Sequence, residues 1–175
     1  IWAGLGLAGQ PALFTVSELW VTLAVVAVNG SLVLVRDNRR AFIGGLGLSV
    51  AGLGLALAAL VGQRLGLLPP FTFMVLLGVG MYVPYVAVHT TLFERLIALT
   101  RERGNIGYLM YLADAVGYLG YAAIMVTRAL LPQRDEFLDF FTHLAGGLLL
   151  VALVALLFAG AAYAQSTTYQ VSRSS

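Results

Sequence analysis

Five long apolar runs, separated by short polar segments, dominate the chain. They cover about residues 15–35, 41–61, 71–99, 106–130 and 140–164. A helix needs roughly 20 mostly apolar residues to cross the hydrocarbon core of a bilayer, so each run is long enough. No sustained alternation of apolar and polar positions indicates a strand, and an open sheet would leave backbone groups unsatisfied in lipid. The pattern predicts an all-α polytopic membrane protein with five transmembrane helices.

Composition narrows the function classes. The 175 residues are 60% hydrophobic and 10% charged, and there is no cysteine. A soluble domain carries about 25% charged residues, so this composition excludes a soluble enzyme, a nucleic-acid binder and a disulfide scaffold. Hydrolase, metalloprotease and nucleotide-loop motifs are absent from the sequence, and two histidines are too few for a haem or dinuclear site. We therefore expect no enzyme, no cofactor, no metal and no nucleic-acid partner.

Arginine placement predicts the orientation of the helices, because positive residues collect on the cytoplasmic side. Alternate connections and the C-terminus hold one group, and the opposite side holds a smaller one: Arg36, Arg39, Arg40, Arg95, Arg101, Arg103 and Arg173 against Arg64, Arg128 and Arg134. Residues 1–14 would then form an outer loop and residues 165–175 a cytoplasmic tail. The odd number of spans and the first residue, Ile1, indicate the C-terminal part of a longer protein.

Small residues dominate the second apolar run. Helical spacing puts Gly47, Ala51, Gly54 and Ala58 on one face, and Gly45-x-x-x-Ser49 adds to it. Small residues four apart let two membrane helices approach closely. We expect this face to serve helix packing and assign it no chemistry.

Polar residues follow one stripe of the first apolar run, which carries Glu18, Thr22, Val25 and Asn29. Polar groups of a membrane helix rarely face lipid. Two interpretations stay open: Glu18 and Asn29 form the wall of a cavity, or Glu18 sits at the outer interface while Asn29 bonds to a neighbouring helix.

The third and fourth runs carry the strongest functional signal. Helical spacing aligns Gly78, Tyr82, Tyr85 and His89 on one helix, and Gly107, Tyr111, Asp114, Tyr118, Tyr121 and Met125 on the other. Reflecting the antiparallel hairpin about its turn places His89 opposite Asp114. The same reflection pairs two tyrosines of each helix: Tyr85 with Tyr118, and Tyr82 with Tyr121.

Depth makes Asp114 the most informative single residue. At 1.5 Å per residue it lies roughly 13 Å below the cytoplasmic edge, near the middle of the bilayer. A lone charge there costs at least about 2.5–3.5 kcal/mol, so Asp114 must be protonated, paired or in contact with water. His89 is a suitable partner because histidine exchanges protons near neutral pH. The pair would couple transport to an ion or proton, or hold a polar substrate group, or merely lock two helices together.

Four tyrosines would line the same path: Tyr82, Tyr85, Tyr111 and Tyr118. Pro84 lies inside the third helix and removes a backbone donor, which frees the carbonyl of Gly80 and predicts a kink or hinge there. At the cytoplasmic side, Glu94 and Arg95 form either an interfacial ion-pair cluster with residues 101–103 or a gate latch.

Parts of the chain resemble known transporters. The turn Asp37-Asn38-Arg39-Arg40 resembles a degenerate copy of the acidic-then-basic loop signature of the major facilitator superfamily, although it lacks the glycine before Arg39-Arg40. Tyr82–Ala98, Asn105–Gly120 and Gln10–Trp20 resemble an uncharacterised bacterial membrane family, a domain of unknown function grouped with major-facilitator-like transporters. The resemblance implies helices eight to twelve of a twelve-helix carrier, with the first, third and fourth spans lining the path and the basic turn acting as a gating loop.

The expected function is thus a secondary active transporter of the major facilitator type, which moves a small polar solute by alternating access, with or without proton coupling. Its partners would be the lipid bilayer, an unidentified solute and the missing N-terminal helices, and its location the bacterial inner membrane. The alternative is a non-transporting membrane scaffold or sensor whose polar seam is structural. Water access separates the two, since a transporter needs Asp114 beside a cavity and a scaffold needs it sealed.

Overall fold

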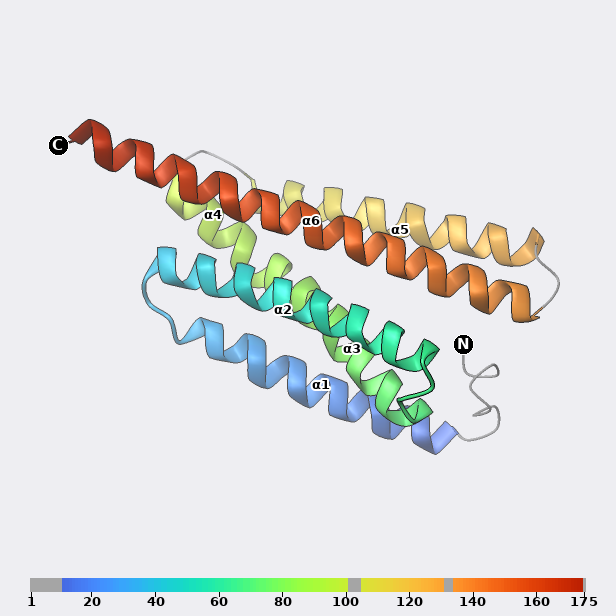
Figure 1. Cartoon of the computed structure of the whole chain (residues 1–175). Coiled ribbons are helices and arrows are strands. Elements are labelled where there is room, and N and C mark those ends of the chain that lie inside the picture. Colours follow the sequence, from blue (N-terminus) through green and yellow to red (C-terminus); the bar gives the residue numbers. More distant parts are fainter. Residues whose placement is uncertain (1–10, 101–104, 131–133, 175) are drawn as a thin grey trace.

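The computed structural model of the chain describes residues 11–100, 105–130 and 134–174, and within these ranges it contains helices and no strand (Figure 1). The elements are α1 (Pro11–Val33), α2 (Asn38–Arg64), α3 (Pro70–Ala87), the π-helix η1 (Val88–Leu92), α4 (Phe93–Thr100), α5 (Ile106–Leu130) and α6 (Arg134–Ser174). The all-α class predicted from the hydrophobic pattern is confirmed.

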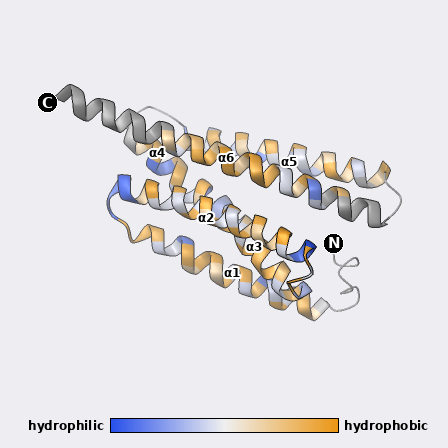
Figure 2. Ribbon diagram, in the orientation of Figure 1, coloured by the Kyte–Doolittle hydropathy of each residue, from blue (hydrophilic) through white to orange (hydrophobic). Residues whose placement is uncertain are grey.

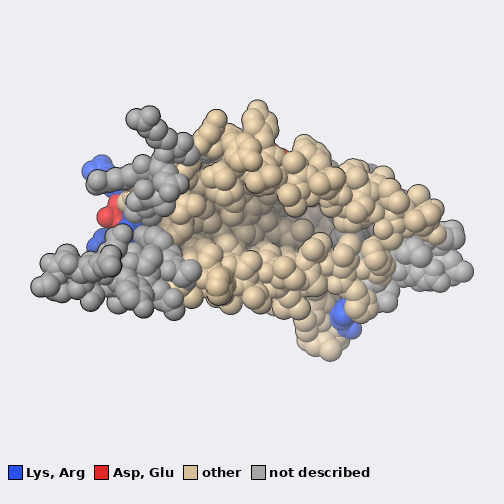
Figure 3. Space-filling view, turned by 90° about the horizontal axis from the view of Figure 1, so that it is seen from above, with Lys and Arg blue, Asp and Glu red and all other residues tan. Residues whose placement is uncertain are grey.

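Five helical segments are long and apolar enough to cross a membrane: Ala12–Val33, Asn38–Arg64, Pro70–Ala98, Gly107–Thr127 and Thr142–Ala161. The third runs without a break through α3, η1 and α4. Apolar residues cover the middle of the helices, while on the face seen in Figure 3 the charged residues lie at the two ends (Figures 2 and 3). The chain is therefore membrane-embedded. The tail predicted at residues 165–175 continues α6 as far as Ser174 rather than forming a separate segment.

Local sequence signals define the ends of α2 and α3. The Asp37 carboxylate accepts a hydrogen bond from the Arg40 backbone N–H at 2.7 Å, which caps the first turn of α2. Gly66 follows the last turn with φ of 69°, the left-handed conformation that glycine adopts without a Cβ penalty. Pro70 then occupies the first turn of α3, where its missing N–H costs no hydrogen bond.

Close backbone contact joins α2 to α3. A Cβ placed on Gly80 would lie 2.6 Å from the backbone nitrogen of Ala56, and one on Gly52 would lie 2.7 Å from Cδ of Pro84. Both distances are shorter than real carbon contacts, so each position accepts only glycine without movement of the helices. This is the small-residue packing expected between membrane helices.

The prediction of which face of α2 packs against other helices is wrong. A Cβ on Gly47 or Gly54 would meet nothing within 4 Å, and Ala51 and Ala58 are exposed in the described part of the chain. The packed residues lie on the next stripe around the helix: Gly45, Ser49, Gly52, Ala56 and Ala59. Of the predicted set, only the added pair of Gly45 and Ser49 belongs to it. Small residues cover most of α2, so spacing alone did not single out the contact face.

The helices differ in how completely they are packed. α3 contacts both α1 and α2, and α6 packs on α2. Two buried clusters fill these contacts, one around Leu53, Ala56, Ala59, Leu60, Phe73 and Leu149 and the other around Val21, Val25 and Val83. No residue of α5 for which burial is described is buried, and α5 contacts the bundle mainly through α4. Figure 1 shows α1, α2 and α3 on one side and α5 and α6 on the other.

Candidate functional site

His89 and Asp114 meet across α3 and α5. His89 lies in η1, at the end of the α3 span, and Asp114 lies near the middle of α5. The His89 Nε2 atom is 3.1 Å from Oδ1 of Asp114, and the two side chains are 18% and 40% exposed. The opposition of these two residues, predicted from the reflected hairpin, is confirmed. The same oxygen of Asp114 accepts a hydrogen bond from the Tyr85 hydroxyl at 3.5 Å.

A second hydrogen bond restricts the protonation of this pair. The His89 Nδ1 atom lies 2.9 Å from the backbone carbonyl of Tyr85, and a carbonyl only accepts, so Nδ1 carries a proton. The contact between Nε2 and the Asp114 oxygen then needs a proton of its own, supplied either by the imidazolium or by the carboxylic acid. Without that proton, two acceptors would face each other. The geometry therefore fits a pair that holds one shared proton.

A π-helical turn places His89 toward α5. In η1 the backbone N–H of Phe93 bonds to the carbonyl of Val88, five residues back, and the turn follows Pro84. Such turns inside α-helices are rare and frequent at functional sites. The sequence analysis missed η1. The available signal was Thr90, whose hydroxyl bonds to the carbonyl of Val86 at 2.7 Å and so competes with regular helix bonds.

A hollow of about 1020 Å³ opens beside the pair, and we call it the Asp114 hollow. Its walls come from α2, α3, η1, α5 and α6: Leu53, Met81, Tyr82, Pro84, Tyr85, Val88, His89, Ala113, Asp114, Gly117, Tyr118, Tyr121, Ala152 and Leu156. The predicted Tyr82, Tyr85 and Tyr118 are among them. Tyr111 is not, since it is 78% exposed and lies outside this wall. The contributions of α2 and α6 were missed because they are apolar positions without a sequence signal.

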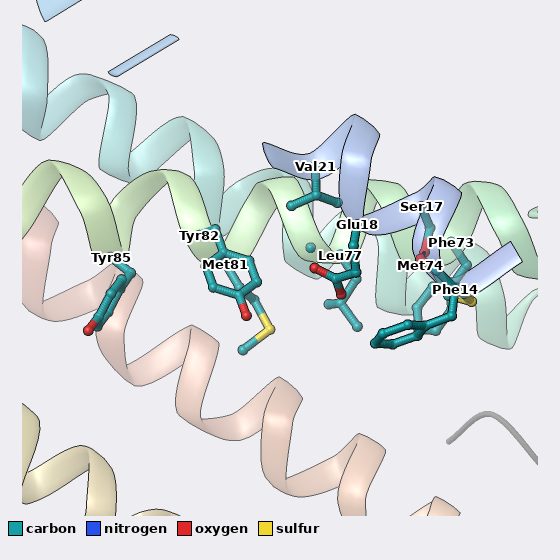
Figure 4. Close-up of a pocket in the computed structure, with 11 residues that line it drawn as sticks. Phe14, Ser17, Glu18, Val21, Phe73, Met74, Leu77, Met81, Tyr82 and Tyr85 are labelled. Carbon is teal, nitrogen blue, oxygen red and sulfur yellow. Dashed lines mark hydrogen bonds between the residues drawn. The ribbon is translucent and has the colours of Figure 1, made fainter. Parts of the chain in front are cut away.

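A second pocket of about 480 Å³ lies between α1 and α3, and we call it the Glu18 pocket (Figure 4). Its walls are formed by Phe14, Ser17, Glu18, Val21, Phe73, Met74, Leu77, Gly78, Met81, Tyr82 and Tyr85. Three of these residues also line the Asp114 hollow: Met81, Tyr82 and Tyr85. The two spaces therefore adjoin along these residues, and Glu18 lines one of them while Asp114 lines the other.

Asn29, the other polar residue predicted on the first helix, lies away from both pockets. It is 6% exposed, and its amide nitrogen donates to the carbonyl of Val25 in the same helix at 3.1 Å. The interpretation that Asn29 bonds to a neighbouring helix is wrong for this amide nitrogen, because it donates instead to the Val25 carbonyl in the preceding turn of the same helix. Its Oδ1 atom is buried without a partner among the described residues. Of the two predicted polar residues, only Glu18 faces a cavity.

The predicted gating residues lie at one end of the bundle. A guanidinium nitrogen of Arg95 donates to Oδ1 of Asn38, which ties the end of the α3 span to the start of α2. Asp37 caps α2, and Arg39, Arg40 and Glu94 are exposed. The partners expected for Glu94 and Arg95 at residues 101–103 lie outside the described residues.

The predicted hinge residues take part in the contact with α2. Gly80 and Pro84 are buried, and α3 continues as an α-helix through Pro84 as far as Ala87. The departure from regular geometry comes one turn later, in η1. For metal binding, no group of three or more His, Asp or Glu side chains gathers anywhere in the described ranges.

Neither the curated proteins nor the solved structures contain a significant match to this chain. A family model described as a family of unknown function, DUF5690, matches residues 1–166. The match covers all five candidate spans and both pockets. The resemblance to an uncharacterised membrane family thereby holds in its general form, as membership of a family without an assigned function. The chain belongs to the DUF5690 family.

Proposed function

We propose that this chain is part of a secondary active transporter of the major facilitator type, which moves a small solute through a bacterial inner membrane by alternating access. The arginine distribution supports a cytoplasmic C-terminus in this membrane. The Asp114 hollow would be part of the solute path, and the His89–Asp114 pair would couple solute movement to a proton.

One observation carries this proposal. The His89–Asp114 pair lies in a candidate span and in the wall of a hollow of about 1020 Å³, instead of being sealed between packed helices. An ionisable residue at membrane depth is costly, and such residues mark ion paths and proton relays. A purely structural hydrogen bond between helices would be better served by a closed contact. The open wall therefore favours transport over the scaffold or sensor alternative.

Proton coupling follows from the hydrogen bonds of the pair. With Nδ1 held by the Tyr85 carbonyl, loss of the shared proton would leave the His89 Nε2 lone pair facing the Asp114 carboxylate. That repulsion would separate the two side chains. The pair is one of few links between α3 and α5, because α5 otherwise contacts the bundle mainly through α4. Release of the proton would thus loosen α5 from α3, which is the kind of movement that alternating access requires.

Transport assays on the full-length protein in liposomes test this proposal. An imposed pH gradient drives uptake from a panel of metabolites and organic ions, for wild type, Asp114→Asn and His89→Gln. Both variants should lose gradient-driven uptake by tenfold or more, while solute exchange without a gradient is retained. The matched control is Asp135→Asn, an acid-to-amide change in α6 outside the candidate span. It should transport like wild type.

Two results would overturn the proposal. One is gradient-driven uptake that survives in both Asp114→Asn and His89→Gln with the same dependence on pH. The other is a folded wild type that transports nothing while water-soluble carbodiimide fails to modify Asp114. The second result would mean that the carboxylate is sealed from water, and it would support the scaffold or sensor interpretation.

A further inference from the structure

The Glu18 pocket has no role in the coupling step, and its residues point to a separate one. Figure 4 shows the carboxylate of Glu18 among the pocket side chains, between the Phe14 ring and the row formed by Tyr82 and Tyr85 on α3. Glu18 is the only charged residue among the described residues of the pocket wall. No hydrogen bond or ion pair joins it to another residue in the described part of the chain. Glu18 is exposed toward this space and lies in a candidate membrane span, where a carboxylate without a partner is unfavourable, so the site favours a ligand that supplies a positive charge.

The fixed charge of the Glu18 pocket and the adjoining Asp114 hollow, taken together, is negative. Among the described residues of the two walls, the Glu18 pocket contributes one carboxylate, and the Asp114 hollow contributes the His89–Asp114 pair, which has no net charge while it holds its shared proton. No arginine is among the described residues of the two walls. Clefts lined by one sign of charge concentrate ions of the opposite sign and repel the others. An anionic solute would find no fixed cation to replace its water.

The other residues of the pocket wall indicate that the cation is organic and largely apolar. Four aromatic rings surround the pocket, from Phe14, Phe73, Tyr82 and Tyr85. Aromatic faces attract organic cations within about 6 Å of the ring centre, most strongly where water is excluded. Met74 and Met81 add flexible, polarisable surface that adapts to ligand shape. The volume of about 480 Å³ lies within the range of about 300–1,000 Å³ that is typical of small-molecule sites.

We infer that the Glu18 pocket binds lipophilic organic cations, and that these are the substrate class of the transporter. The inference rests on the proposed function for its transport step, but the binding step stands alone. A small inorganic cation fits poorly, because such ions need several oxygen ligands and this wall offers one carboxylate and the Ser17 and tyrosine hydroxyls.

A cation bound in the Glu18 pocket would act on the shared proton of the nearby His89–Asp114 pair. Met81, Tyr82 and Tyr85 line both the Glu18 pocket and the Asp114 hollow, and the Tyr85 hydroxyl bonds to Asp114. A positive charge behind this wall favours the ionised carboxylate and opposes retention of the shared proton. The proton would leave to water as the cation enters, so the two cations exchange and the charge within the site is conserved.

Binding of tetraphenylphosphonium to the purified full-length protein in nanodiscs tests the inference. Tetraphenylborate, an anion of nearly the same shape, is the matched ligand control. Glu18→Gln should weaken tetraphenylphosphonium binding by about tenfold or more and leave any tetraphenylborate binding unchanged or tighter. Glu18→Asp, which keeps the charge, should retain most of the affinity, and Asp135→Asn should bind like wild type.

A second pair of variants covers the case in which Glu18→Gln does not fold. Tyr82→Leu removes an aromatic ring from the pocket, whereas Tyr111→Leu removes one that lies outside it. The first should weaken tetraphenylphosphonium binding by roughly threefold to tenfold, and the second should have no effect. Equal binding by the two Tyr variants, or wild-type affinity in Glu18→Gln, would overturn the inference.

The failures of the two proposals are distinguishable. Tetraphenylborate that competes with tetraphenylphosphonium at equal affinity would show an apolar pocket for lipid or detergent, and would overturn the cation site. Proton-driven uptake of another solute by a protein that does not bind tetraphenylphosphonium would overturn this inference alone. Charge-dependent binding without any gradient-driven transport would leave the cation site in place and overturn the transporter proposal.

Discussion

Along α3, the side toward α2 and the side toward α5 carry different kinds of residue. Toward α2 lie Gly80 and Pro84, both buried, and the neighbouring Val83 is buried against Val21 and Val25 of α1. Toward the pockets lie Met81, Tyr82 and Tyr85, which are about half exposed in the described chain. Gly80 brings two backbones into contact, whereas the tyrosines hold α5 away from α3 and leave space between them. One helix therefore serves both as the fixed part of the bundle and as the wall of the candidate site.

The difference shows how a membrane protein separates rigidity from function. Without water to drive helices together inside a bilayer, close packing of small residues is a main source of affinity between them. Long polar side chains prevent such packing, so a site built from them is also a place where helices are weakly joined. In the described part of the chain the weakly joined helix is α5, and its contact with η1, at the end of the α3 span, joins the titratable side chains of His89 and Asp114.

The largest expected effect concerns the packed side of α3. Gly80→Leu should lower the free energy of unfolding by about 3 kcal/mol or more, because its Cβ alone would overlap the Ala56 backbone. Thermal unfolding of the protein in detergent measures it. Gly54→Leu is the matched control, since a Cβ there meets nothing within 4 Å of the described chain, and its stability should stay near wild type. Similar losses from both substitutions would mean that the α2–α3 contact is not the rigid one.

The next effect concerns the link between α3 and α5. His89→Ala and Asp114→Ala each remove one partner of the same contact, so their effects on stability should not add. We expect a coupling of about 0.5–3 kcal/mol in a double-mutant cycle measured by unfolding at pH 6. Additive effects would show that the two side chains do not interact in the membrane protein. A cycle between Asp114→Ala and Gly54→Leu should show no coupling.

A smaller effect separates two tyrosines of similar chemistry. Tyr85→Phe removes a hydroxyl that donates to Asp114, and a long hydrogen bond of 3.5 Å to a charged group contributes modestly. Gradient-driven uptake should fall about twofold to fivefold. Tyr111→Phe, outside the Asp114 hollow, should transport at the wild-type rate. Equal uptake by the two variants would mean that the residues lining the solute path are not those that line the Asp114 hollow.

The smallest effect is expected at the end of the bundle. Asn38→Ala removes the acceptor of Arg95, a contact near the water boundary, and should cost about 1 kcal/mol or less in unfolding experiments. Transport should be unchanged if Arg95 only ties α4 to α2. A large loss of transport with normal stability would instead assign this contact to the gate.

Sequence reasoning was most accurate where the signal was strong and local. Five runs of apolar residues define five spans, because the bilayer sets a minimum length for a helix that crosses it. The opposition of His89 and Asp114 followed from the regular rise of two antiparallel helices joined by a short turn.

Tertiary structure decided the rest. Small residues occur on several stripes of α2, and only the position of α3 selects Gly52 and Ala56 over Gly47 and Gly54 as the contact face. In η1 the backbone bond reaches five residues back instead of four. The hydrogen bonds that compete with the regular helix bonds there cannot be read from the spacing of residues in the sequence. The two pockets are spaces between helices, and their apolar walls on α2 and α6 carry no signal of their own. The sequence alone thus determined the number of spans and the opposition of His89 and Asp114, while packing determined which faces touch and where space remains, because these depend on how every helix meets its neighbours.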